Sequence, residues 1–225
     1  MKRILMCIIC LFIFIPFTKA EEKSNTLAPN AKSAILLEES TGEILYEFNS
    51  HEKREPASMT KMMSLVLIME AIEKGVIKEE QIITVSENAS SMGGSQILLE
   101  TGEEMSVDDL LKGITIASGN DAVVALAETI AGTEENFVKM MNDKLVELGL
   151  KDSNFKNCHG LDEANHYSSA YDMSMIAKEL LNHEDILNYT SIYETYLRED
   201  TDRKIWLVNT NKVVYKFYNS FINSY

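Results

Sequence analysis

The chain has 225 residues with a formal net charge of −14 at pH 7, and 45% of its residues are hydrophobic. So acidic a protein repels nucleic-acid phosphates and anionic lipid headgroups, which excludes nucleic acid as an expected partner. Of its three cysteines, Cys7 and Cys10 lie in an N-terminal apolar run. The remaining Cys158 alone can build neither a disulfide framework nor a cysteine–metal site.

Residues 1–20 predict a secretory signal peptide. Lys2 and Arg3 provide a basic start, residues 4–17 are apolar, and residues 18–20 form a small-x-small cleavage site. The apolar run is too short for a transmembrane helix, so we expect no membrane anchor in the mature chain. The sequence thus predicts an exported protein that works outside the cytoplasm, in the cell envelope or secreted.

After a polar leader at residues 21–32, strand-like segments lie at both ends of the chain and helices lie between them. In chain order, the sequence predicts strands at residues 33–38 and 43–48, a helix at 58–74, a strand at 81–85, helices at 106–117, 121–131, 134–148 and 169–182, and strands at 193–198 and 204–209. This order predicts an α+β fold, with one sheet whose strands come from both ends of the chain and a helical insertion between them.

In the helix predicted at residues 58–74, the apolar positions 62, 63 and 65–69 leave no polar face, so the helix is expected to be buried. Ser58 and Lys61 stand three positions apart at its start, where helical neighbours can meet in a hydrogen bond. Burial and the positive end of a helix lower the pKa of an ammonium group. A neutral lysine can then activate a serine hydroxyl without histidine. Ser58 and Lys61 are therefore a candidate nucleophile and base.

The Ser-x-x-Lys pattern also occurs at Ser50 to Lys53 and at Ser153 to Lys156, but both of these lie in polar stretches. Only Ser58 opens a buried helix. The alternative interpretation is that Ser58 is an ordinary helix N-cap, as serines at helix starts commonly are.

A second polar group, Ser118-Gly119-Asn120, lies between two predicted helices. A serine beside a nucleophile can relay a proton, and an asparagine can hold a substrate amide. The alternative is a plain helix–helix connection in which Asn120 or Asp121 caps the next helix.

Ser58-Met59-Thr60-Lys61 and Ser118-Gly119-Asn120 resemble the first two motifs of the low-molecular-mass penicillin-binding proteins. These are serine-type D-alanyl-D-alanine carboxypeptidases (peptidase S11-like), relatives of the class A β-lactamases. The resemblance runs from about residue 33 to about residue 212, with further matches at residues 91–95, 110–113, 120–122, 157–162 and 167–173. It implies a transpeptidase-like, β-lactamase-like fold: an antiparallel sheet packed with helices, a helical subdomain, and an active site in the cleft between them.

The resemblance also implies a role for each matching residue. Ser58 would be the acylated nucleophile and Lys61 its general base. Ser118 would relay a proton to the leaving D-alanine, and Asn120 would hold both the substrate amide and Lys61. The implied substrate is a peptidoglycan stem peptide ending in D-Ala-D-Ala. β-Lactams would acylate the same serine, the Ser58 N–H would form half of the oxyanion hole, and no metal or organic cofactor is needed.

The third motif of the family, Lys-Thr-Gly, occurs nowhere in the sequence. Residues 206–212 resemble the family's approach to it, but residues 213–225 do not continue the pattern. We therefore expect residues 33–212 to be an incomplete carboxypeptidase domain without its C-terminal strands, followed by a divergent tail. The missing strand would bind the substrate carboxylate and supply one oxyanion N–H, so the chain as written is expected to be a poor catalyst.

Two other functions stay open. A β-lactamase would need a Glu-x-x-Leu-Asn pattern, and the nearest stretch, residues 179–182, is one residue short. A non-catalytic exported binding protein, or a catalytically defective remnant, is favoured by the missing third motif.

His159 and His166 lie in a polar loop and are expected to be solvated rather than to bind a metal. Cys158 is expected to be an incidental thiol.

Overall fold

The computed structural model describes residues 27–214. The predicted signal peptide lies outside the described residues, as do the first part of the polar leader and most of the predicted tail. All helices and strands described below belong to one compact unit that begins at Lys32. Within residues 27–214, no helix has both the length and the apolar character that crossing a membrane requires.

The strands form three separate two-stranded antiparallel sheets in the described part of the chain. They pair as β1 (Ala34–Leu37) with β2 (Ile44–Phe48), β3 (Ile82–Thr84) with β4 (Glu104–Ser106), and β5 (Glu194–Leu197) with β6 (Ile205–Val208). The mixed α+β class is as predicted, but the prediction of one sheet is wrong for residues 27–214. The reason is local pairing: β1–β2 and β5–β6 are each neighbours in sequence, and no ladder of hydrogen bonds joins one pair to the other.

Helices occupy the middle of the chain, close to the predicted ranges. The long helices are α2 (Lys61–Glu73), α4 (Val107–Ala117), α5 (Asn120–Ala131), α6 (Glu134–Glu147) and α7 (Ala170–Leu181). The short helices α3 (Glu87–Ser90) and α8 (Ile186–Thr190) are absent from the sequence-based prediction. Four of the described helices begin at side-chain caps, because the hydroxyls of Ser86, Ser106, Thr133 and Ser169 each accept the N–H three residues later.

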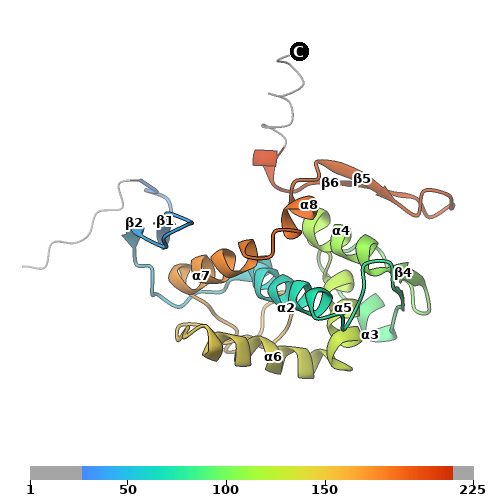
Figure 1. Ribbon diagram of the computed structural model, residues 1–225, viewed down its shortest axis with the longest axis horizontal. Coiled ribbons are helices and arrows are strands. Elements are labelled where there is room, and N and C mark those ends of the chain that lie inside the picture. The colour runs from blue at the N-terminus through green and yellow to red at the C-terminus, as the bar shows by residue number, and fades with distance from the viewer. Residues whose placement is uncertain (1–26, 215–225) are drawn as a thin grey trace, which may run out of the picture. The chain divides into compact units, whose positions relative to one another are not determined.

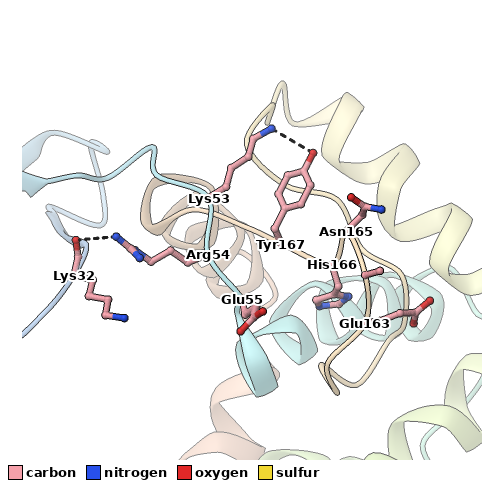
Figure 2. A pocket seen from close by; sticks show the side chains of 9 residues that line it. Lys32, Lys53, Arg54, Glu55, Glu163, Asn165, His166 and Tyr167 are labelled. Atoms are coloured by element: carbon pink, nitrogen blue, oxygen red, sulfur yellow. Dashed lines mark hydrogen bonds between the residues drawn. The ribbon is translucent and has the colours of Figure 1, made fainter.

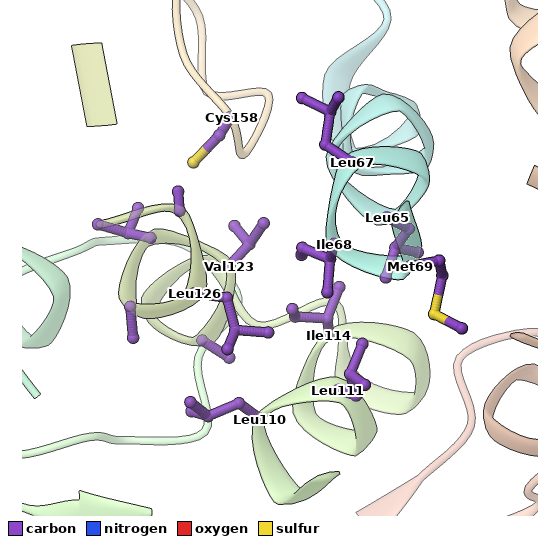
Figure 3. Packing of buried hydrophobic residues seen from close by; sticks show 14 of the residues in the cluster. Leu65, Leu67, Ile68, Met69, Leu110, Leu111, Ile114, Val123, Leu126 and Cys158 are labelled. Carbon is purple, nitrogen blue, oxygen red and sulfur yellow. The ribbon is translucent and has the colours of Figure 1, made fainter. Parts of the chain in front are cut away.

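The central helix is α2, which contacts α5, α6 and α7. Figure 1 shows α2 in turquoise, between α7 and α5. Every residue from Met63 to Met69 is buried, which confirms that this stretch has no solvated face. Figure 3 shows Ile68 of α2 in the same apolar cluster as Ile114 of α4 and Val123 of α5. The first turn of α2 is therefore held at the edge of a packed core.

A buried carboxylate shapes the loop that precedes α4 in the chain. Asp121, near the start of α5, has no exposed surface. Its carboxylate accepts hydrogen bonds from the N–H groups of Ile97 at 3.1 Å, Leu99 at 3.0 Å and Ala122 at 2.9 Å. Leu98, between the first two donors, has a φ of 59°. The positive end of α5 favours the negative charge of Asp121. The carboxylate thus fastens this loop beside Asn120.

The substitution Asp121→Asn should destabilise the protein. The new amide nitrogen would face backbone N–H donors, so at least one buried donor would lose its acceptor. We expect the free energy of unfolding, measured by urea denaturation, to fall by about 1–3 kcal/mol. Asp143→Asn is the control, because the Asp143 side chain is 64% exposed and pairs with Lys139 at the surface. That change should alter stability by less than about 0.5 kcal/mol. Equal losses in the two variants would contradict the importance of the buried carboxylate.

Candidate active site

Ser58 lies in a single 3₁₀ turn, η1 (Ala57–Thr60), that leads directly into α2. The α-helix therefore begins at Lys61, three residues later than predicted. Ala57 has a φ of 47°, so the chain enters the turn from a left-handed conformation, and tight turns of this kind are common at helix starts. Within the described chain, neither η1 nor α2 has a side-chain cap. The interpretation of Ser58 as an ordinary N-cap is therefore wrong.

The amino group of Lys61 has three oxygen neighbours, and the residue is only 4% exposed. Nζ lies 2.6 Å from Asn120 Oδ1, 2.7 Å from the backbone oxygen of His159 and 3.4 Å from Ser58 Oγ. An ammonium group would donate to all three. A neutral amine would donate its two hydrogens to the two nearer oxygens, which leaves its lone pair facing the Ser58 hydroxyl. This geometry would let a neutral Lys61 accept a proton from the Ser58 hydroxyl.

Burial lowers the pKa of Lys61 to about 8, against opposing contributions from Cys158 and Asp121. An unperturbed lysine has a pKa near 10.4, so it carries almost no neutral amine at pH 7. With a pKa of about 8, roughly a tenth of the molecules hold Lys61 neutral at that pH. The lowered pKa agrees with the sequence-based expectation, and desolvation is its main cause.

The loop at residues 157–160 closes over the first turns of α2. Ser64 Oγ donates to the carbonyl of Cys158 at 2.7 Å, one residue before the carbonyl that binds Lys61. Gly160 has a φ of 92°, and a Cβ there would lie 2.0 Å from Ala57 O. Only glycine therefore lets this loop approach the turn that carries Ser58 so closely. The two buried polar residues of α2 dock the loop, and the loop in turn encloses Lys61.

Asn120, the first residue of α5, is held by three hydrogen bonds. Its Oδ1 accepts from Lys61, its Nδ2 donates to the carbonyl of Gly93 at 2.7 Å, and its backbone N–H donates to Ser95 O at 2.7 Å. A Cβ at Gly94 would lie 2.8 Å from Asn120 Nδ2. The turn at residues 93–95 thus orients the amide so that its oxygen faces Lys61, and one Nδ2 hydrogen stays free for another acceptor.

Ser118 lies at the C-terminal end of α4, where it has a φ of 59° and is half-buried. Its backbone N–H donates to Ile114 O at 3.0 Å, and Asn120 follows two residues later. Among the described residues, hydrogen bonds join Ser58, Lys61 and Asn120 but do not include the Ser118 side chain. The structure therefore brings three of the four predicted residues into contact and places Ser118 on the adjoining turn.

His159 and His166 are 7% and 5% exposed, so the prediction that they are solvated is wrong. His166 Nδ1 accepts the N–H of Lys156 at 3.1 Å, so Nε2 carries the proton and donates to Thr60 Oγ1 at 2.8 Å. His159 Nδ1 accepts the N–H of Leu161 at 3.1 Å. Burial lowers the pKa of each histidine, which favours the neutral ring. Both side chains brace the loop around Lys61.

Cys158 is buried, and burial, reinforced by Glu134, raises the pKa of its thiol well above the ordinary value. The thiol is therefore a poor nucleophile, in line with the sequence-based expectation. Sequence reasoning gave no role to the Cys158 and His159 carbonyls or to Gly160, because a backbone oxygen has no residue-type signature. The available signal was the match of residues 157–162 to the family pattern.

A pocket of about 610 Å³ is lined by residues 163–167, which follow the loop at residues 157–160 in the chain, and by residues 32 and 53–55. Figure 2 shows its wall, where the amino group of Lys53 lies 3.3 Å from the Tyr167 hydroxyl and Arg54 extends toward the Lys32 carbonyl. The residues that contact the Lys61 amino group through their side chains do not line this pocket. The pocket is thus a neighbour of the candidate site and not the site itself.

A family model described as D-alanyl-D-alanine carboxypeptidase matches residues 18–222. The chain is 58% identical over 224 residues to the D-alanyl-D-alanine carboxypeptidase DacF of Bacillus subtilis (strain 168), with 97% of this chain and 57% of that protein aligned. It is 36% identical over 227 residues to the D-alanyl-D-alanine carboxypeptidase DacA of Escherichia coli (strain K12), with 96% and 55% aligned. The chain thus spans little more than half the length of these curated relatives.

Solved structures of penicillin-binding proteins share the fold. Penicillin binding protein 5 from Haemophilus influenzae has a TM-score of 0.78 and 33% identity, covering 84% of this chain and 54% of that one. Penicillin binding protein 6B from Escherichia coli has a TM-score of 0.77 and 35% identity, covering 82% and 59%. These similarities confirm the transpeptidase-like fold that the two motifs imply. The chain belongs to the D-alanyl-D-alanine carboxypeptidase family, peptidase S11.

Proposed function

We propose that the protein is a serine-type carboxypeptidase that removes the terminal D-alanine from peptidoglycan stem peptides ending in D-Ala-D-Ala, outside the cytoplasm. The observation that carries the proposal is the buried amino group of Lys61, which Asn120 and the His159 carbonyl hold against Ser58 Oγ. The names of the relatives support the substrate class. β-Lactams, which resemble the terminal dipeptide, are proposed to acylate Ser58.

The proposed acylation begins when Ser58 Oγ attacks the carbonyl carbon of the D-Ala-D-Ala bond and neutral Lys61 accepts the hydroxyl proton. The C–N bond then breaks, and Ser118 relays the proton held by Lys61 to the nitrogen of the departing D-alanine, which returns Lys61 to its neutral form. Water next attacks the ester of acyl-Ser58, with Lys61 again accepting a proton. The shortened peptide leaves and the Ser58 hydroxyl is restored. These steps use only side chains of the chain and water.

The backbone of the site supports the same reaction. The Ser58 N–H is proposed to stabilise the developing oxyanion, and the 3₁₀ turn and the close approach of Gly160 fix the position of that N–H. Asn120 is proposed to give its remaining Nδ2 hydrogen to a substrate carbonyl while its oxygen holds Lys61. One residue thus positions both the base and the substrate.

The purified protein should form a covalent adduct with penicillin on Ser58 and, because its sequence contains no Lys-Thr-Gly, should release D-alanine from a stem pentapeptide only slowly. Peptide mass mapping should find the adduct on Ser58, and Ser58→Ala should abolish it. Ser50→Ala, which alters another Ser-x-x-Lys pair, is the control and should keep full labelling. An adduct on Ser50, Ser118 or Ser153 would contradict the assignment. Labelling without D-alanine release would instead support a penicillin-binding protein that lacks carboxypeptidase activity.

The substitution Lys61→Arg should abolish acylation although it preserves the positive charge, because a guanidinium group does not lose its proton near neutral pH. In the parent protein, only the neutral amine of Lys61 acts as a base. The acylation rate should therefore rise about tenfold per pH unit below the pKa of about 8 and level off above it. Stopped-flow measurement with a chromogenic β-lactam checks this profile. A flat profile from pH 6 to 9 would identify Lys61 as a charge contact only.

Two adjacent glycines test the orientation of Asn120. In Gly94→Ala, the new Cβ would lie 2.8 Å from Asn120 Nδ2, and the φ of 79° disfavours any side chain. Displacing the amide should slow acylation by roughly 10–100-fold. In Gly93→Ala, the Cβ would meet nothing within 4 Å, so this variant is the matched control and should react normally. Similar rates in the two variants would show that Asn120 does not position the base.

A further inference from the structure

The side chain of His183, two residues beyond α7, is 8% exposed and carries an unpartnered nitrogen. Its Nδ1 lies 2.6 Å from Glu73 Oε1, so this carboxylate holds the ring proton on Nδ1. The lone pair of Nε2 then points into the protein. Within residues 27–214, Nε2 is buried and has no hydrogen-bond partner. Buried polar atoms without partners are rare in native proteins. Nε2 is therefore a candidate ligand atom that could donate its lone pair to a bound metal ion.

Two carboxylates lie beside this histidine. One ligand atom from each of Glu70, Glu179 and His183 lies within 4.8 Å of those of the other two. Glu70 is on α2 and Glu179 on α7, and these helices pack directly against each other. Atoms that bind one ion at about 2.0–2.2 Å lie somewhat closer together than this, so small side-chain rotations would close the set. One nitrogen and two oxygens are a donor set that suits Zn²⁺.

The surroundings have the features of a metal site. Histidines that bind metals usually donate their other ring N–H to a carboxylate, as His183 does to Glu73. This outer carboxylate fixes the tautomer, so that Nε2 presents its lone pair. Glu179 is oriented in a similar way, because Asn182 Nδ2 donates to its Oε2 at 3.0 Å. Both outer contacts leave the inner ligand atoms available.

The local charge favours a cation although two lysines are present. Two of the three ligands, Glu70 and His183, line a cavity of about 440 Å³. Its other lining residues are three acids, two lysines and two apolar residues: Glu73, Asp143, Glu147, Lys74, Lys144, Leu67 and Met140. Lys144 and Lys74 each lie 2.6 Å from one oxygen of Glu70. Each carboxylate oxygen has two lone pairs, so Glu70 can bind an ion without releasing its lysines. Lys144 also lies 2.8 Å from Glu147, and the negative charge of Glu147 partly neutralises the positive charge of Lys144 near the three ligands.

We propose that Glu70, Glu179 and His183 form a binding site for one divalent cation, with Zn²⁺ as the fitting ion. The bound ion would link α2 to the chain just beyond α7. This site is structural and separate from the Ser58 and Lys61 chemistry, which lies at the other end of α2.

The test uses the purified protein, stripped with a chelator and titrated with Zn²⁺ alone by calorimetry. We expect one saturable equivalent and a higher melting temperature with Zn²⁺ than with chelator. Co²⁺ should bind at the same stoichiometry and give visible absorption bands. Absence of saturable binding, or binding that leaves the melting temperature unchanged, would overturn the proposal.

Variants distinguish this site from adventitious binding. His183→Ala and Glu179→Gln should each weaken Zn²⁺ binding by tenfold or more, and Glu73→Gln should weaken it by about 10–100-fold through the outer contact. His51→Ala is the matched control, because His51 also pairs with a carboxylate, Asp152 at 2.8 Å, but is 60% exposed. If His183→Ala does not fold in chelator, Glu179→Gln and Glu73→Gln decide the outcome. Unchanged affinity in these variants would overturn the proposal.

Discussion

Removing an amino group from water is costly, and the burial of Lys61 at the start of α2 constrains everything around it. The group is tolerated because three oxygens surround it, supplied by Ser58, Asn120 and the backbone of His159. A different part of the structure holds each of these oxygens in place. The 3₁₀ turn positions Ser58, the turn at residues 93–95 positions Asn120, and the buried Ser64 hydroxyl docks the loop that carries the carbonyl.

The same contacts give the lysine its chemistry. A lysine surrounded by water stays protonated at neutral pH, whereas desolvation here brings its pKa to about 8. The acceptors limit this shift, since they also stabilise the ammonium form. The negative charge of Asp121, the residue after Asn120, also stabilises the ammonium form and raises the pKa of Lys61. The site thus balances desolvation, which lowers the pKa of Lys61, against polar contacts that offset the cost of burying its amino group.

Local chemistry made the helices and the Ser58–Lys61 pair predictable. Helix caps such as Ser106 and Thr133 act on an N–H three residues away, and the long apolar run of α2 could only be buried. The arrangement of strands was not predictable, because pairing depends on partners that the local pattern does not name. Within residues 27–214 the strands pair as hairpins and as the β3–β4 ribbon, not as one sheet.

The rest of the site could not be predicted from the sequence, because it consists of backbone atoms and of polar side chains that acquire their partners only on folding. Composition suggested solvent around His159 and His166, yet each ring is buried with its own hydrogen bonds. The sequence did not single out His183 for the same reason, because Glu70 and Glu179 become its neighbours only when α2 packs against α7.

The enclosure of Lys61 has a consequence for the order of events during folding. Ser58 and Lys61 meet within one turn, but Asn120 is 59 positions from Lys61 in the sequence and His159 is 98. Forming contacts between such distant residues requires long loops to close, which costs chain entropy. A chain with α2 formed but the loop at residues 157–160 undocked would hold a hydrated, protonated lysine beside an ordinary serine. Any reactivity of Ser58 that depends on the enclosure of Lys61 therefore requires the completed tertiary structure.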